Sequence, residues 1–302
     1  MTTVSLTCSW NGGRTVRELR TCPVTGTLVI LNETWVERRP DAPPPPPGTC
    51  PYCRRWPSVI MTAPGVGDTL IQAVPHPTPA LGVEGDVRIR HEDGRVRRDA
   101  VGAHELIFGC HGGDDAAVLR LVQARIADLR RDVRLRGFHI VRHAKPGWHP
   151  VWQLVALPID VAPSAPAHWR DAELGEGTRL VGVHDDAVAI LAWAPTVPFE
   201  TWVLPRTGRQ VFEAADPTAV VVLVERIRAR MLGALGPVRI DIRVVDGEPW
   251  RIELLPRLGA SRPVEAATGL PLHGVFPERA ARYLREVGSA GPPVGEFSTD
   301  DR

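Results

Sequence analysis

The sequence predicts an α+β fold in which antiparallel sheets pack against helices. Residues 114–131 and 217–235 each carry apolar side chains every three or four residues, the spacing of an amphipathic helix. Short apolar and β-branched runs, typical of strands, flank both segments on either side. The order of strand pair, helix and strand pair therefore occurs twice, which indicates an internal duplication of one α+β unit.

Turn signals separate the strands expected in the first half. Glu92-Asp93-Gly94 lies between two short runs and predicts a hairpin. The five prolines at 43–47 require an extended connector, because proline lacks the amide hydrogen that helices and central strands use. Residues 64–85 are rich in Pro and Gly and are expected to form a loop region. We expect strands at 27–31, 56–63, 87–90, 95–98, 105–108, 138–142 and 152–157.

The second half repeats this order. Asp246-Gly247 predicts another hairpin, and residues 278–287 predict a final helix. Strands are expected at 187–193, 200–204, 238–245 and 250–255. We therefore place the two halves at residues 17–160 and 177–290, followed by a flexible tail at 291–302 that is rich in Pro, Gly and Asp.

Composition narrows the class of protein. The 302 residues are 43% hydrophobic and 24% charged, as in soluble globular proteins, and the net charge of +1 implies no basic face for nucleic acid. No apolar run reaches the roughly 18 residues of a membrane-spanning helix, and the N-terminus lacks the features of a signal peptide. We expect a cytoplasmic protein with neither a membrane nor a nucleic acid as partner.

The cysteines indicate a metal more than a disulfide framework. Their number is odd, and disulfides are rare in the cytoplasm. Cys50-Pro51-Tyr52-Cys53 is a C-x-x-C motif, which in this setting indicates metal or redox chemistry. A thioredoxin-like role is disfavoured, because the motif follows the proline run and does not open a helix after a strand. The five cysteines are Cys8, Cys22, Cys50, Cys53 and Cys110.

An ordered set of short motifs spans most of the chain. His149-Pro150-Val151-Trp152-Gln153 precedes an apolar strand, and residues 102–107 are Gly-Ala-His-Glu-Leu-Ile. The further motifs lie at 17–26, 38–40, 50–53, 198–206, 251–257 and 277–281. Together they resemble the galactose-1-phosphate uridylyltransferase family, a branch of the histidine-triad superfamily. The resemblance implies duplicated histidine-triad-like units and an enzyme that acts on nucleotides and sugar phosphates.

The resemblance also implies a structural zinc ion. Carried over residue by residue, the family's ligands fall on Cys50, Cys53 and His149, and His111 is the nearest candidate for the fourth. Two thiolates and two imidazoles would form a closed tetrahedral site that contributes folding free energy. The alternatives to His111 are Cys110 and Cys22.

Two further interpretations concern the C-x-x-C motif and a possible second metal site. The C-x-x-C motif by itself is also compatible with a coincidental pair of buried thiols. Some family members hold a second metal with a His-Trp-His motif, but the corresponding residues here are Pro249-Trp250-Arg251. Both histidine ligands are missing, so we expect no second metal.

The residue that acts as nucleophile in the family is missing. There the second His of a His-Pro-His motif attacks the α-phosphate, and Val151 occupies that position here. Valine has no lone pair with which to attack phosphorus. His143 and Lys145 are candidates for a substitute, as are His139 on the preceding strand and His149 itself, although a solvated or hydrogen-bonded role is the simpler interpretation of the first three.

Other positions indicate what remains of a ligand pocket. Gln153 matches the family glutamine that holds a phosphoryl oxygen, and Arg20 and Arg39 match arginines that neutralise phosphates. A phosphate-contacting serine of the family is replaced by Pro146. Trp152 could stack on a planar ligand or simply fill volume, and with Val151 it makes the pocket more apolar.

Two functions compete. One is a divergent enzyme with altered chemistry on a nucleotide, a sugar phosphate or a less charged ligand, favoured by Gln153, Arg20 and Arg39. The other is a catalytically inactive binding or scaffold protein on the same fold, favoured by Val151 and Pro146. Ordinary uridylyl transfer is not expected. Family members often form dimers, so a homodimer is the candidate assembly.

Overall fold

The structure is a computed structural model, and it describes residues 16–24, 27–32, 52, 56–65, 67, 69–109, 115–143, 150–160, 168–208, 210–259 and 263–287. Among these residues, no helix is both long enough and apolar enough to cross a membrane. The strands form two sheets, one of ten strands and one of four.

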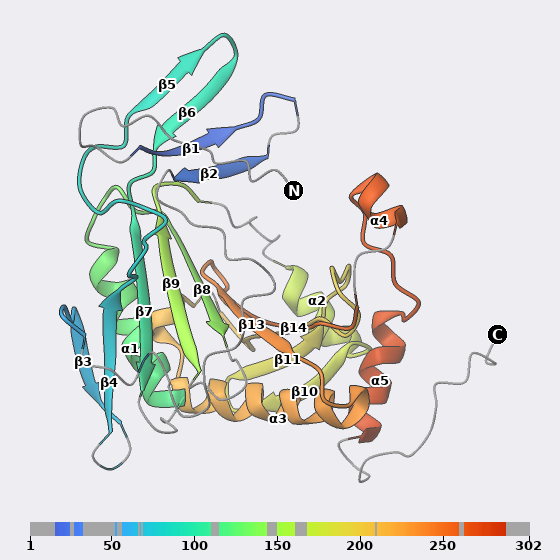
Figure 1. Ribbon diagram of the computed structural model, residues 1–302. Coiled ribbons are helices and arrows are strands. Elements are labelled where there is room, and N and C mark those ends of the chain that lie inside the picture. Colours follow the sequence, from blue (N-terminus) through green and yellow to red (C-terminus); the bar gives the residue numbers. More distant parts are fainter. Residues whose placement is uncertain are drawn as a thin grey trace, which may run out of the picture.

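The ten-stranded sheet organises the molecule (Figure 1). Its strand order is β10-β11-β12-β14-β13-β8-β9-β7-β4-β3, and every neighbouring pair is antiparallel. The strands are β3 (Met61–Pro64), β4 (Leu70–Pro75), β7 (Ala103–Gly109), β8 (Gly137–His143), β9 (Val151–Leu157), β10 (Leu180–His184), β11 (Ala187–Leu191), β12 (Thr201–Pro205), β13 (Ile240–Val245) and β14 (Arg251–Pro256).

This order confirms the predicted α+β duplication. Read outward from its centre, the sheet gives β8-β9-β7-β4-β3 in one direction and β13-β14-β12-β11-β10 in the other. The five strands of each half therefore follow the same arrangement, with a helix inserted between the third and fourth strands in sequence. The pairing of β8 with β13 joins the two groups of five strands into one sheet.

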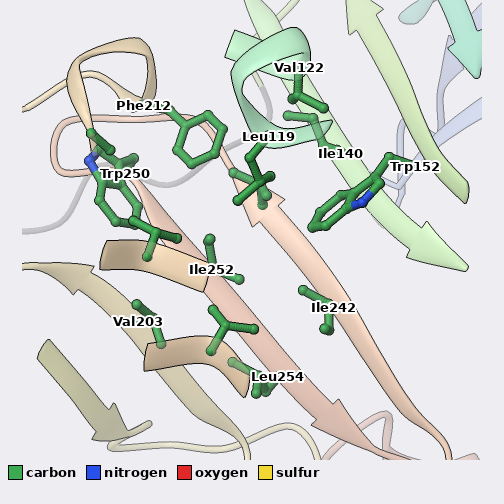
Figure 2. Packing of buried hydrophobic residues seen from close by; sticks show 14 of the residues in the cluster. Leu119, Val122, Ile140, Trp152, Val203, Phe212, Ile242, Trp250, Ile252 and Leu254 are labelled. Carbon is green, nitrogen blue, oxygen red and sulfur yellow. The ribbon is translucent and has the colours of Figure 1, made fainter. Parts of the chain in front are cut away.

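One face of this sheet is covered by α1 (Asp115–Leu129), α3 (Pro217–Leu235) and α5 (Pro277–Val287). Leu119 and Val122 of α1 pack above Ile140 and Ile242, which lie on the two strands that join the halves (Figure 2). A single apolar cluster contains residues of both halves. The amide of Gln123 crosses between them by donating to the carbonyl oxygens of Phe212 and Ala215, both at 2.9 Å.

The remaining elements lie around this core. The four-stranded sheet has the order β2 (Leu28–Asn32), β1 (Arg17–Thr21), β6 (Arg95–Asp99) and β5 (Ile89–Glu92). Leu19 of β1 packs with Leu81 and with Leu157 at the end of β9, which attaches this sheet to the large one. The helix α2 (Trp169–Glu176) packs on the second half, the short helix η1 (Phe212–Ala214) precedes α3, and α4 (Pro263–Thr268) has no buried residue.

Some predicted boundaries were wrong. The region 64–85, expected to form a loop, contains β4, because Ile71 and Ala73 alternate into the core between turn-forming residues. The strand expected at 56–63 is shorter and begins at Met61. The sequence also did not predict β1, β10, α2, η1 and α4.

A buried ion pair fixes α1 on the sheet. The carboxylate of Glu105 on β7 accepts from Nε of Arg125 at 2.8 Å and from its Nη2 at 2.6 Å. Both side chains are only 5% exposed. A guanidinium that forms two parallel hydrogen bonds holds a carboxylate in one orientation, so the pair sets how the helix sits on the strand.

Breaking this pair should strongly destabilise the fold. Arg125→Met leaves the Glu105 carboxylate buried without its guanidinium, which costs about 3–5 kcal/mol in free energy of unfolding. Urea denaturation should show this loss, and the double variant with Glu105→Leu should lose less than Arg125→Met alone. Arg131, which is 82% exposed, gives the control: Arg131→Met should stay within about 0.5 kcal/mol of the wild type. Equal losses for Arg125→Met and Arg131→Met would contradict the structural role of the pair.

Candidate functional site

The face of the large sheet that points away from α1 and α3 carries polar side chains at its centre. Strand alternation produces this separation: on β9, Trp152 and Leu154 enter the helix-covered core, so Val151 and Gln153 point to the other face. On β8, Ile140 enters the core in the same way. We define the polar patch as His139, His143, Gln153, Arg243, Arg251 and Glu253, all on this second face.

The strand register brings these groups together. Val141 of β8 lies directly between Gln153 of β9 and Arg243 of β13. His143 lies directly opposite Val151. Opposed residues on antiparallel strands have Cβ atoms about 4.5–5.5 Å apart, so the patch is continuous across four adjacent strands. Gln153, His139 and His143 are all partly exposed.

The second half supplies the charged part of the patch. Glu253 is almost fully buried and forms ion pairs with Arg243 and Arg251 from either side. Nε of Arg243 and Nε of Arg251 donate to its two carboxylate oxygens, each at 2.7 Å. The guanidinium of Arg251 also lies over the ring of Trp202, 5.0 Å from the centroid. Two guanidinium groups with one carboxylate leave a net positive charge, which favours an anionic ligand.

Val151 lies in an apolar cluster at the edge of the patch. It is 1% exposed and packs with Trp56, Phe108 and Leu106. Tyr52 packs against this cluster, and its ring lies 5.5 Å from that of Phe108. The Val151 side chain is therefore enclosed by aromatic and aliphatic side chains.

His104 of β7 is a diagonal neighbour of Gln153 on the adjacent strand β9, and its ring is neutral at pH 7. Its Nδ1 accepts a hydrogen bond from the backbone N–H of Ala80 at 3.1 Å, so the proton is assigned to Nε2. The ring of His76 stacks on it with centroids 4.0 Å apart. Burial, followed by the charge of His76, lowers the pKa of His104 to about 4, and a side-chain hydrogen bond with Gln153 acts in the opposite direction.

His139 is the most enclosed imidazole of the polar patch. Its Nε2 is buried and has no hydrogen-bond partner among the residues that the structure describes. Burial lowers its pKa, and the nearby charge of Arg243 lowers it further. Both effects favour the neutral form of this ring.

The predicted site residues divide into three groups. Val151, Gln153 and His143 lie together on the open face. Arg20 lies on the small sheet, paired with Glu18 at 2.7 Å, and points away from the side on which its neighbour Leu19 packs against the large sheet. The positions outside the described residues are Arg39, Cys50, Cys53, Cys110, His111, Lys145 and His149.

Trp152 requires a correction. Its side chain is 3% exposed and lies in the main core on the helix-covered face (Figure 2). Adjacent residues of a strand point to opposite faces, so Trp152 cannot line the same pocket as Gln153. The alternative interpretation, that this indole fills volume, agrees with its position.

The sequence motifs did not identify Arg243, Arg251 and Glu253 as site residues. They also did not show that His104 is a polar neighbour of Gln153. A signal was present: residues 240–245 and 251–256 are buried strands in which charged residues alternate with apolar ones. Such alternation in an otherwise apolar strand indicates that one face of the sheet carries functional polar groups. Which strand of the first half lies beside these charges depends on the pairing of β8 with β13, and the sequence does not show that pairing.

No cluster of three or more potential metal-ligating side chains occurs within the described part of the chain. The candidate zinc ligands lie outside it, but their neighbours do not. Tyr52 lies between the two cysteines of the C-x-x-C motif, Phe108 lies three residues before His111, and Val151 lies two residues after His149. These three neighbours belong to one apolar cluster. The fold therefore brings Tyr52, Phe108 and Val151 together, although they lie far apart in the sequence.

Comparison with known proteins agrees with the fold. An ADP-glucose phosphorylase from Arabidopsis thaliana is 21% identical over 331 residues, covering 89% of this chain and 93% of the relative. The solved structure of an ADP-glucose phosphorylase from the same plant, with bound ADP-glucose, matches with a TM-score of 0.60 at 19% identity over 90% of this chain and 98% of that one. No family model matches the sequence.

A uridylyltransferase structure matches with a TM-score of 0.63 at 17% identity, again over 90% of this chain and 98% of that one. A third solved structure, a GalT-like protein from Arabidopsis thaliana, gives a TM-score of 0.58 over 76% of this chain and 87% of the other. Identities this low show a common fold and do not transfer an activity. The predicted resemblance to uridylyltransferases is thus confirmed at the level of the fold.

The burial of neutral His104 should make stability depend on pH. Its pKa of about 4 in the folded protein lies below the ordinary value of 6.5, so between these values the unfolded chain binds more protons. Stability should therefore fall as pH falls through this window, by about 2 kcal/mol between pH 7 and pH 4.5 from this group alone.

Urea denaturation of wild type and His104→Gln at both pH values tests this expectation. The drop from pH 7 to pH 4.5 should be about 2 kcal/mol smaller in the variant, because glutamine does not titrate. His91→Gln, which changes an exposed histidine of β5, should keep the full wild-type drop. An unchanged pH dependence in His104→Gln would show that this ring is not the titrating group.

Proposed function

We propose that this protein is an enzyme that binds a nucleotide sugar or a sugar phosphate on the polar patch, and that its chemistry does not pass through position 151. The observation that carries the proposal is the meeting of Gln153, two imidazoles and two arginines on one partly exposed face. The likeness to an ADP-glucose phosphorylase and to a uridylyltransferase supports a ligand of this class.

The residues of the patch suit the parts of such a ligand. The amide of Gln153 can donate to a phosphoryl oxygen, and Arg243 and Arg251 can offset the charge of the phosphates. Arg243 is 47% exposed and is the guanidinium better placed to reach a ligand, whereas Arg251 is 21% exposed and is held over Trp202. The apolar cluster around Val151 excludes water from one edge, which strengthens electrostatic interactions beside it.

We also propose a structural zinc ion held by Cys50, Cys53, His149 and His111, with Cys110 or Cys22 as alternatives for the last position. Two thiolates and two imidazoles match the preferred ligands of zinc in closed tetrahedral sites. The apolar cluster of Tyr52, Phe108 and Val151 supports this ligand set, because each of these residues is a close sequence neighbour of a candidate ligand. When bound, the ion would stabilise this end of the sheet and take no part in bond breaking.

The alternative is a catalytically inactive binding or scaffold protein on the same fold. Val151 in place of the nucleophile, enclosed by Trp56 and Phe108, is the observation that favours it. Both proposals keep a ligand on the polar patch and differ in turnover. The cytoplasmic location and the homodimer remain predictions from the sequence.

Zinc content is the first test of the metal proposal. Natively purified protein should contain about one zinc per chain by elemental analysis, and Cys53→Ala should contain far less and unfold at lower temperature. Cys22→Ala is the matched control: Cys22 is a partly exposed cysteine directly after β1, and this change should leave the zinc content unchanged. Loss of zinc from Cys22→Ala alone would move the site to that cysteine, and less than about 0.2 zinc per chain in the wild type would contradict a closed four-ligand site.

Binding of ADP-glucose and UDP-glucose tests the function. Calorimetry should detect binding of at least one of them, and Arg243→Gln should weaken it by about 10- to 100-fold, the cost of one charge-assisted hydrogen bond. Arg257→Gln provides the control, since Arg257 is an arginine just beyond β14 that pairs with Asp241. Binding with release of a sugar phosphate or a nucleotide would support the enzyme, and binding without turnover would support the inactive alternative. No binding of any nucleotide, nucleotide sugar or sugar phosphate would refute the proposed ligand class.

A further inference from the structure

His104 is a buried histidine at the edge of the polar patch. It is 6% exposed and lies on β7, diagonally across from Gln153 on β9. Leu106 is the residue directly opposite Gln153, and His104 lies two positions before Leu106, so all three side chains point to the same face. Diagonal neighbours of this kind lie within reach of long side chains.

The segment that follows β4 holds the His104 ring in one tautomer. The backbone N–H of Ala80 donates to Nδ1 at 3.1 Å, so this nitrogen is an acceptor and the ring proton is assigned to Nε2. The ring of His76 stacks on that of His104, with the two planes 9° apart. The segment is itself fastened, because the amide of Asn32 donates to the carbonyl oxygen of Pro79 at 2.9 Å. The fold therefore sets both the position and the tautomer of His104.

The Nε2–H group of His104 is a buried donor beside Gln153. Nε2 makes no hydrogen bond of ordinary geometry to any residue in the described ranges, although the Gln153 side chain is close enough to offset part of the lowering of the ring's pKa. A buried donor without an acceptor costs free energy, so a small rotation of the Gln153 amide that closes this contact is favourable. Only the oxygen of that amide can accept, since Nε2 carries the proton.

This contact selects one of the two orientations of the Gln153 amide. With Oε1 toward His104, the NH2 group points away from the ring and is left for a ligand. The reversed amide would present its oxygen instead, and an oxygen with a partial negative charge repels a phosphoryl oxygen. Gln153 is partly exposed, so whichever end of its amide points outward can contact a bound molecule.

His139 of β8 is the other imidazole with a buried Nε2 near Gln153, but its ring leans the other way. A Cβ atom built on Gly137 would lie 3.5 Å from this Nε2. Gly137 and Val141 lie on opposite sides of His139 along the strand, and Val141 is the residue opposite Gln153. His104 is therefore the better partner for the amide oxygen.

We propose that His104 is a positioning residue, whose Nε2–H holds Oε1 of Gln153 and so directs the NH2 group of Gln153 at a phosphoryl oxygen of the ligand. This inference rests on the proposed function, because it requires a phosphorylated ligand on the polar patch. It adds a determinant of specificity: at this point the patch offers a hydrogen-bond donor and selects an acceptor. His104 acts through Gln153 and does not itself touch the ligand.

A double-mutant cycle on the full-length protein tests the coupling. Calorimetry gives the dissociation constants of ADP-glucose and UDP-glucose for wild type, His104→Leu, Gln153→Leu and the double variant. Gln153→Leu should weaken binding by about 10- to 100-fold, the cost of one charge-assisted hydrogen bond, and His104→Leu by about 3- to 10-fold. The double variant should bind within about twofold of Gln153→Leu, because His104 has no effect once Gln153 is gone.

Two further variants separate orientation from stability. His104→Gln keeps an acceptor for the N–H of Ala80 and a donor for Gln153, so it should bind within about twofold of the wild type. Gln123→Leu removes a different buried amide, which donates to two carbonyl oxygens beside α1. This control should unfold at a lower urea concentration and keep the wild-type dissociation constant.

The tautomer gives a test that needs no ligand. Long-range ¹H–¹⁵N NMR at pH 7 should show a ring with protonated Nε2 and unprotonated Nδ1, assigned to His104 by its loss in His104→Gln. A protonated Nδ1 would refute the proposal, because Nε2 would then have no hydrogen to donate.

The binding results separate this inference from the function on which it rests. Wild-type binding that His104→Leu leaves unchanged, or losses that simply add in the double variant, would overturn the role of His104 and leave the proposed ligand class standing. Failure of the wild type to bind any nucleotide, nucleotide sugar or sugar phosphate would refute the proposed function, and the positioning role with it.

Discussion

The antiparallel pairing of β8 with β13 is the constraint on which the other features depend. It places Ile140 beside Val244, and so aligns apolar positions of both halves under α1 and α3. Because side chains alternate along a strand, the same register must align the remaining positions on the other face. A slip of one residue would turn Arg243 into the core, at a cost of several kcal/mol for an unpaired buried charge. Core packing therefore fixes the geometry of the polar patch indirectly.

The two faces of the large sheet have different roles. The helix-covered face stabilises the fold, and the opposite face carries the polar patch. The helix-covered face holds one continuous apolar cluster, and its buried ion pair between Glu105 and Arg125 orients α1. The opposite face carries separate apolar clusters around Trp56, around Trp169 and around Leu157, and the polar groups lie between them. Substitutions on the second face can change charge without opening a cavity in the main core. A fold of this kind can lose one reactive residue and keep its shape.

The duplication shows how the two halves have diverged at equivalent positions. Gln153 opposes Val141 in the first half, as Glu253 opposes Arg243 in the second, and Val151 corresponds in the same way to Arg251. The first half thus keeps a neutral amide beside imidazoles, whereas the second half carries a carboxylate between two guanidinium groups. The central pairing puts the uncharged hydrogen-bonding groups of one half next to the positive charges of the other. Neither half alone would present both to one ligand.

The sequence by itself determined the fold class, the duplication, the two long helices and most strands of the large sheet, because each depends on local periodicity and turn residues. It also singled out Gln153 and Val151, since both belong to one short motif. It could not find β4, whose alternation is hidden among Pro and Gly, or assign Trp152 to the core, because both depend on which strand lies alongside. Only the tertiary structure placed His143 opposite Val151 and brought Arg243 next to β8. Those positions follow from hydrogen-bonded register between strands, a long-range property that no stretch of sequence encodes alone.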